Sequence, residues 1–571
     1  MTRAVNQKKV KTLFFTRLNP IIFLYNSRIM HLFRQFITPL LCICLLAAGR
    51  MVQGQQPAFT SFDGFKSALM QAVQQRTSLN VQHKTIPAVY IEQLLQHPPA
   101  TPEFSRLGLF MSNAIITGRL NLLNLISSAI INISYSTFED TVNLNNAALH
   151  SFVELNNDTF YKAVNAEYLS VDQSLDLTGS VFKSTADFSR MKAGEDVYCN
   201  STQFNTWVEF SNAVIGKSLF FKYAWLNNSA EAAYLRYMDI GKDLDFTGSY
   251  FYDSVFLGGS VIARNLLLDR VKCWRQFDAV EITVGGQLTG YYVYLYDLIL
   301  NSSTVKNLLR FDNSRIDYMD LAFLRQERSS LWLSADTIVS GLLTNMDVSD
   351  LHLESSRFTS YLDLSFTNAN RLQLSLSTLP KTVPFHPKDT GRLYLDGLTY
   401  KTLLMSKMTS FDSLQQFLQV LNAAPVSQTG YYNFEQYCRN VNADDLPDKV
   451  YITYRKRTAS GIKDWLLDWL VGYGREPARI FIYIIIFILI GTLVFRDKNK
   501  MVNVKPEIPE TTYNPFFYSF DLFLPVINLK DAENWIPQKQ YKFLRFYRRI
   551  HALIGWVVIP IGLAAISGLV K

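Results

Sequence analysis

Acidic and amide side chains recur between apolar residues in the middle of this 571-residue chain, and carboxylates could act there as general acids and bases. Clear examples are Asp176, Asn212, Asp245 and Asp312. Each stands where the chain is expected to turn, and Asp and Asn are common in turns because their side chains hydrogen-bond to nearby backbone. We therefore favour a turn role for these four residues over a catalytic one.

Histidine and cysteine could supply metal ligands or nucleophiles, but their spacing fits neither use. Three cysteines, widely spaced along the chain, follow the first 54 residues: Cys199, Cys273 and Cys438. They form no disulfide framework and no CxxC site, so we interpret them as small buried hydrophobic residues. No two of the seven histidines have the spacing of metal ligands: His31, His83, His97, His150, His352, His386 and His551.

No nucleotide-binding or hydrolase motif of the types GxGxxG, P-loop or GxSxG occurs in the sequence. The sequence therefore predicts no catalytic, cofactor-binding or metal-binding residue, and no cofactor.

The formal charge of +8 reports topology and not nucleic-acid binding. Residues 1–54 carry eight Lys or Arg and no Asp or Glu, and residues 496–571 carry 11 against six. The remaining segment, 55–495, has 37 basic and 42 acidic residues and is mildly acidic. Nucleic-acid partners are therefore not expected.

Apolar residues recur every eleven positions through the middle of the chain. The series runs from Met111 through Leu122 to Phe221, resumes after a three-residue slip at Leu235, and continues with steps near ten to twelve as far as Leu395. A second apolar residue follows each anchor by five positions, as Phe182 follows Leu177. This period differs from 3.6, and Thr, Ser, Asn, Val, Phe and Tyr favour strands or turns over helices.

These repeats predict an all-β solenoid in which short extended segments point alternate side chains inward. The stretch Ala186-Asp187-Phe188-Ser189-Arg190, with a small residue two positions before the Phe anchor, resembles the pentapeptide-repeat family with degenerate repeats. That resemblance implies a right-handed quadrilateral parallel β-helix over about 109–400. The C-terminal segments are similar to the tail of membrane-bound bacterial proteins of this family, whose activity is generally unassigned.

The N-terminus has the pattern of a secretory signal peptide. Read from Met30, a basic start precedes an apolar stretch from Phe36 to Ala48 and the small or apolar residues of Val52-Gln53-Gly54. A retained N-terminal membrane anchor is the alternative, although the apolar stretch is shorter than the roughly 20 residues that a span needs.

Two apolar runs near the C-terminus, 478–495 and 551–570, are long enough to cross a bilayer. Ten Lys or Arg crowd the loop between them, which by the positive-inside rule places that loop in the cytoplasm and residues 55–475 outside. Phe516 to Ile527 within the loop is expected to lie in the membrane interface. Ala564 and Gly568 form a small-xxx-small pair that permits either packing against the first span or homo-oligomerisation.

Val471-Gly472-Tyr473-Gly474 matches four residues of the potassium-channel filter. A filter must lie between the two spans, whereas this tetrapeptide precedes the first one. We therefore favour a turn that leads into the membrane.

The predicted organisation has seven parts: 1–54 signal peptide with its start at Met30, 55–108 N-terminal cap, 109–400 β-helix, 401–477 helical juxtamembrane region, 478–495 transmembrane helix 1, 496–550 basic cytoplasmic loop with an interfacial segment, and 551–570 transmembrane helix 2. The expected function is a non-enzymatic binding or scaffold protein of the cell envelope, periplasmic if bacterial, whose partners are the lipid bilayer and an envelope protein or glycan. The alternatives are a carbohydrate-active or other enzyme on the solenoid face, and a two-span channel or signal transducer with a solenoid sensor.

Overall fold

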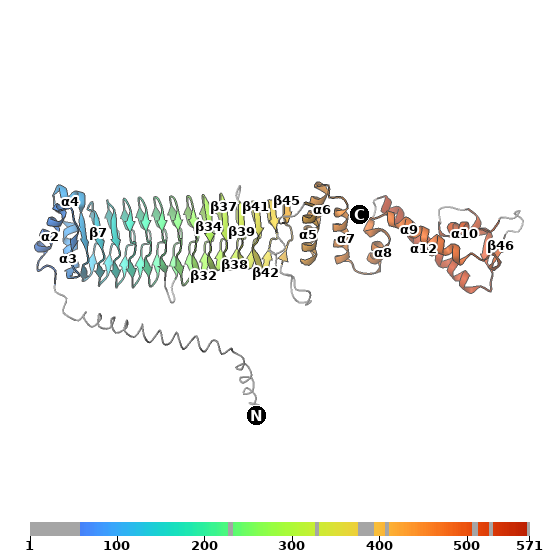
Figure 1. Ribbon diagram of the computed structural model, residues 1–571, viewed down its shortest axis with the longest axis horizontal. Helices are drawn as coiled ribbons and strands as arrows, with labels where there is room; N and C mark the ends of the chain where they lie inside the picture. The colour runs from blue at the N-terminus through green and yellow to red at the C-terminus, as the bar shows by residue number, and fades with distance from the viewer. Residues whose placement is uncertain are drawn as a thin grey trace, which may run out of the picture.

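A computed structural model describes residues 57–226, 232–325, 330–374, 393–405, 410–504, 512–524 and 529–567. The predicted signal peptide, 1–54, lies outside the described residues. Figure 1 shows an elongated molecule with a few helices at one end, a long stack of strands in the middle and a helical region at the other end.

Three helices lie at the N-terminal end of the strand stack, in the segment for which the sequence predicts a cap: α2 (Phe62–Gln74), α3 (Ala88–Gln96) and α4 (Pro102–Leu107). The hydroxyl of Ser61 accepts a hydrogen bond from the N–H of Gly64 and starts α2. Ile91 and Leu94 of α3 are fully buried in the same core as the first strands. The helices thus cover apolar side chains that have no preceding turn to pack on.

The middle of the chain is a parallel β-solenoid, as the repeat predicts. One turn contributes four strands of two residues: β15 (Leu175–Asp176), β16 (Val181–Phe182), β17 (Ala186–Asp187) and β18 (Lys192–Ala193). The next strand, β19 (Val197–Tyr198), pairs with β15 so that Leu175 lies beside Val197, 22 residues later. Fifteen strands stack in this way in one sheet, from β1 (Leu79–Asn80) to β45 (Thr399–Met405).

The interior of the solenoid consists of like residues stacked on like residues. Phe138, Phe160, Phe182 and Phe204 are buried, and their ring centroids are 4.6 to 4.9 Å apart from turn to turn. The Ser180 hydroxyl, also buried, donates to the carbonyl oxygen of Leu155 in the preceding turn at 2.6 Å. The apolar anchors therefore fill the axis, and the small polar residues satisfy backbone groups at the corners.

Left-handed backbone recurs every eleven residues at two corners of each turn. Asn157, Gly179 and Ser201 occupy one corner with φ of 57°, 73° and 53°. Asn and Gly suit this conformation, but Tyr223 also adopts it with φ of 55°. Its ring lies where a Cβ on Gly248 of the next turn would stand, so the aromatic side chain covers the glycine.

The cross-section of the solenoid changes along its length. From β32 (Lys272–Asp278) onward, strands of five to eight residues replace many of the two-residue strands. The register of β32 against β35 (Tyr294–Ile299) shifts between Cys273 and Gln276, so one strand continues round a corner that earlier turns leave unpaired. A second sheet of the solenoid, which has nine strands and includes β18, ends at β36 (Thr304–Val305). The steps of ten to twelve residues in the sequence coincide with these longer strands.

Four helices follow β45, the last strand of the solenoid: α5 (Ser410–Ala423), α6 (Gln428–Asn440), α7 (Leu446–Thr458) and α8 (Ile462–Val471). Arg457 of α7 donates to the carbonyl oxygens of Leu421 and Ala424, both at 2.8 Å, at the end of α5. The guanidinium group thereby satisfies carbonyls that the end of a helix leaves without an internal partner.

One helix of the described chain, α12 (Lys542–Ile566), is long and apolar enough to cross a membrane. The predicted first span forms α9 (Ala478–Val494), an apolar helix of 17 residues. α12 starts nine residues before the predicted second span, because the basic segment that precedes the apolar run is helical too.

A third helix, α10 (Pro515–Phe523), lies where the sequence predicts an interfacial segment, and it packs against both α9 and α12. Phe523 is fully buried there. Part of the expected segment, 525–528, lies outside the described residues. Two short antiparallel strands, β46 (Met501–Asn503) and β47 (Trp535–Pro537), close the loop.

Candidate functional site

Of the four carboxylate and amide residues that the sequence singles out, Asn212 lies in a turn, and the other three end strands: Asp176 ends β15, Asp245 ends β27 (Leu244–Asp245) and Asp312 ends β37 (Leu308–Asp312). Asp176 and Asp245 each accept a hydrogen bond from the backbone N–H two residues later, at 2.8 and 2.9 Å. Asn212 has φ of 60°, and Asp312 pairs with Arg310 at 2.7 Å. The side chains of Asp176 and Asp245 thus cap the backbone that follows their strands, which is the turn role that the sequence predicts for them.

The described histidines belong to separate parts of the fold. His150 contacts Asp172 at 2.9 Å on the surface, His352 stacks on Trp332, and His551 is buried between helices. His31 and His386 lie outside the described residues. Cys199, Cys273 and Cys438 are free and buried, which confirms their interpretation as hydrophobic residues. Among the residues that the structure describes, no cluster of three His, Cys, Asp or Glu could hold a metal ion.

The structure gathers aromatic and cationic side chains on one outer face of the solenoid. Parallel pairing aligns one side chain from each of five successive turns: Trp225, Tyr250, Lys272, Tyr294 and Arg315. They come from β24 (Trp225–Leu226), β28 (Tyr250–Phe251), β32, β35 and β38 (Arg315–Asp320). Together with the adjacent Trp274 and Tyr296, we call these residues the aromatic strip.

Rings and cations contact one another along the strip. The rings of Trp225 and Tyr250 are 5.2 Å apart, and the Lys272 ammonium lies 5.1 Å from the Tyr250 ring. Trp274 packs against Tyr294 at 4.8 Å. The Arg315 guanidinium also lies over the Tyr294 ring, 5.7 Å from its centroid. Such contacts hold the side chains of the strip in place.

Trp225, Trp274 and Tyr296 are 44%, 47% and 51% exposed, so the strip is a solvent-facing surface. Large exposed aromatic side chains that lie side by side are typical of binding surfaces.

Carboxylates flank the strip. Asp317 accepts a hydrogen bond from Arg315 at 3.1 Å. Burial raises the pKa of Asp297, and the nearby negative charge of Asp317 raises it further. Beneath the strip, burial raises the pKa of the Cys273 thiol to about 12, so this sulfur stays a neutral thiol. The strip thus offers ring faces, cationic donors and carboxylate acceptors along one line.

The strip was not predicted, because the repeat is recognised from the apolar anchors, which face inward. A signal was present: Trp274 and Tyr296 are spaced by 22 residues, which is one turn of the solenoid, and the exposed Tyr252 precedes Trp274 by the same interval. This short outward run is less apparent than the inward apolar series, which extends along most of the solenoid.

Two surface cavities lie away from the strip. One, of about 450 Å³, lies between β45 and α6 and is lined by polar residues that include Lys401, Asn433 and Gln436. The other, in the C-terminal helical region, is lined by three arginines.

The tetrapeptide Val471 to Gly474 turns the chain between α8 and α9. Gly472 takes the left-handed conformation that ends α8. The sequence predicted a turn at this tetrapeptide, before the apolar helix α9. No family model, curated protein or solved structure matches this chain.

Proposed function

We propose that this protein is a membrane-anchored, non-enzymatic binding protein of the cell envelope whose solenoid binds an extended glycan along the aromatic strip. The observation that carries the proposal is the alignment of aromatic and cationic side chains on five successive turns. A pyranose ring has an apolar face of C–H groups that stacks on an aromatic ring, and its hydroxyls bind charged side chains.

The geometry of the strip favours a polymer over a small molecule. Neighbouring strands of a sheet are about 4.8 Å apart, which is close to the length of one sugar unit in an extended chain. Successive turns of the solenoid would then meet successive sugars. Single-stranded nucleic acid also stacks on aromatic rings, but it requires a positive groove, and segment 55–495 has an excess of acidic residues.

We favour binding over cleavage because the strip is open to solvent. Cleavage of a glycan needs a carboxylate pair placed on either side of one bond. Asp297 and Asp317 flank the strip from adjacent strands, whereas Trp225 lies three turns before the strand that carries Asp297. A long aromatic surface contributes affinity along the whole chain of sugars and not at a single bond.

The membrane part of the proposal rests on α12, on the apolar helix α9 and on the basic loop between them. In this proposal both helices span the bilayer, the loop lies in the cytoplasm, and a signal peptide exports the solenoid. The four strands in each early turn agree with a right-handed quadrilateral helix of the pentapeptide-repeat type, which we include in the proposal.

Binding is tested with the purified full-length protein and two soluble probes, a β-1,4-linked hexamer of N-acetylglucosamine and one of glucose. We expect Trp274→Ala to weaken binding of at least one probe by about 3- to 10-fold, because it removes one stacking contact. Titration calorimetry measures the affinity. Trp332→Ala is the control, since Trp332 is a partly exposed tryptophan on another sheet of the same solenoid.

Equal weakening by both substitutions, or no binding of either probe, would contradict the proposal. Release of new reducing ends from a probe would favour the enzyme alternative. Topology is tested separately with a reporter fused at residue 300. Activity of that reporter in the cytoplasm alone would overturn the exported orientation.

A further inference from the structure

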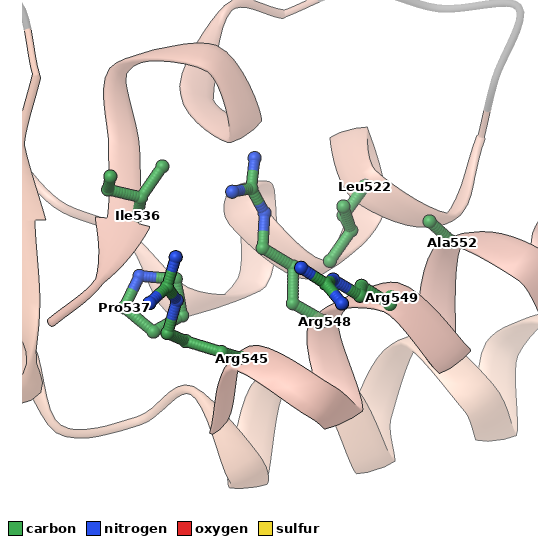
Figure 2. A pocket seen from close by; sticks show the side chains of 7 residues that line it. All are labelled: Leu522, Ile536, Pro537, Arg545, Arg548, Arg549 and Ala552. Atoms are coloured by element: carbon green, nitrogen blue, oxygen red, sulfur yellow. The ribbon is translucent and has the colours of Figure 1, made fainter. Parts of the chain in front are cut away.

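The arginine-lined cavity lies at the end of α12 where the apolar run of that helix begins. It has a volume of about 290 Å³ and is lined by Arg545, Arg548, Arg549 and Ala552 of α12, Leu522 of α10, and Ile536 and Pro537 of β47. Figure 2 shows the three arginine side chains between Ile536 and Pro537 on one side and Leu522 and Ala552 on the other. A concentrated positive charge thus borders an apolar wall.

One of the three arginines is held in place by a backbone carbonyl. Arg548 donates to the carbonyl oxygen of Ala532 at 2.9 Å. In the described part of the chain, neither Arg545, Arg548 nor Arg549 forms an ion pair with a carboxylate. The buried acid Asp521 of α10 accepts hydrogen bonds from the N–H groups of Leu529 and Ala532, both at 2.8 Å. Its charge therefore stabilises the loop that orients Arg548.

Apolar side chains extend outward from this cavity on both sides. Phe543 and Phe546, in the first turns of α12, are 68% and 62% exposed. Leu553 and Trp556, one to two turns further along, are 62% and 66% exposed. Exposed aromatic residues at the end of an apolar helix are typical of the headgroup level of a bilayer. With α12 in the bilayer, as proposed above, the cavity lies at the level of the lipid phosphate groups.

We propose that this cavity binds the phosphate of an anionic phospholipid, with the guanidinium groups of Arg545 and Arg549 on the phosphate oxygens and the acyl chains along the exposed apolar face of α12. Guanidinium groups bind phosphate through paired hydrogen bonds, and basic pockets beside membrane helices bind lipid headgroups. The apolar half of the cavity favours a lipid over free phosphate, which offers no group to contact Leu522 or Ala552.

This inference rests on the part of the proposed function that places α12 in the membrane. Its test uses full-length protein, stripped of lipid in detergent, to which phosphatidylglycerol or phosphatidylcholine is added. Native mass spectrometry measures the bound lipid. We expect phosphatidylglycerol to bind more tightly, and the double variant Arg545→Gln with Arg549→Gln to bind it roughly 20- to 30-fold more weakly, about fivefold for each arginine.

The matched control is Arg496→Gln with Lys539→Gln, which removes two positive charges from exposed positions of the same loop outside the cavity. We expect less than a threefold change in that variant. The variant Arg545→Lys with Arg549→Lys should recover part of the affinity, because it restores the charge but not the paired geometry. Unchanged circular dichroism of all variants separates lost binding from lost folding.

Equal weakening by the cavity variant and the control would overturn the inference, since binding would then depend on net charge alone. Displacement of the lipid by inorganic phosphate at equal concentration would overturn it too, because the site would be one for free phosphate. Washing membranes with alkaline carbonate distinguishes the two proposals: release of the protein would refute both the membrane anchor and this site, whereas retention leaves the anchor standing whatever the lipid result.

Discussion

The solenoid and the C-terminal helical region are stabilised in opposite ways. In the solenoid each residue packs on its counterpart one turn away, as Phe160 does on Phe138 and Phe182. In the helical region the contacts follow no fixed period. Arg475 pairs with Glu435 at 2.8 Å, as Arg439 does, and it also lies over the ring of Tyr451 at 4.4 Å.

This difference predicts how far the loss of stability from a single substitution should extend. In a repeated array each turn contacts only its neighbours, so the loss of stability caused by one substitution stays within the turns that contact the altered residue. In the helical region no repeated contact replaces one that is lost, so a single substitution should displace a whole helix. Four substitutions test this contrast, beginning with the largest expected effect.

Phe182→Ala removes a fully buried ring from the stacked column of the solenoid. We expect local stability to fall by about 3–5 kcal/mol, because a cavity remains and two neighbouring rings lose their contact. Hydrogen exchange of the full-length protein should show faster exchange in the adjacent turns and unchanged exchange in α9 and α12. Phe366→Ala, which alters a 60% exposed ring of the same solenoid, is the control. Faster exchange along the entire solenoid would refute the local response.

Asp336→Asn tests a departure from the repeated corner positions, since its buried carboxyl occupies a place like that of Ser180. Asp336 accepts a hydrogen bond from the Ser314 N–H at 2.7 Å, and burial raises its pKa from 3.8 to about 7. The folded chain therefore holds a proton that the unfolded chain releases above pH 3.8. Stability contributed by the neutral acid is present below that value and is lost as pH rises to about 7.

At pH 8 we expect Asp336→Asn to stabilise the solenoid by roughly 2–4 kcal/mol, and at pH 4 to change it little. Denaturant unfolding at the two pH values measures this difference. Asp239→Asn, at an exposed strand position, serves as the comparison. An equal effect of Asp336→Asn at both pH values would contradict the assignment of a neutral buried acid.

Gly555→Ala tests the unique contacts of the helical region. A Cβ at Gly555 would overlap the carbonyl oxygen of Phe523, so α10 would have to move away from α12. We expect a loss of about 1–3 kcal/mol, observed as faster hydrogen exchange throughout α10 with the solenoid unchanged. Leu553→Ala, on the exposed face of the same helix, should leave α10 unaffected. Protection of α10 in the Gly555 variant equal to that of the unaltered protein would count against the contrast.

Tyr237→Gly should have the smallest effect. Tyr237 has φ of 56°, and its ring covers Gly259 of the next turn. Glycine adopts this backbone without strain, whereas the lost ring contact has the opposite effect, so we expect a net change below about 1 kcal/mol. Tyr237→Ala loses the ring and keeps the strain, and it should be the less stable variant in thermal unfolding. The reverse order would show that backbone strain does not decide stability at this corner, since both variants lose the ring.

Much of the solenoid was predictable because apolar residues recur along the sequence with the period of its turns. Leu177 and Phe182 are inward anchors in both the sequence argument and the structure, and the free cysteines are buried as expected. The register shift beside Cys273 was not predictable, since it depends on how one turn fits the next. The same holds for the aromatic strip, whose members are 21 to 25 residues apart and become neighbours through strand pairing.

The sequence by itself determined the repeat, the inward anchors, the apolar helix α12 and the basic loop before it, because each depends on local composition or on a fixed period. The tertiary structure alone decided which outward side chains share a face, and which arginines of α12 meet the walls formed by α10 and β47. These arrangements join residues through contacts made once, between segments whose spacing in the sequence carries no period.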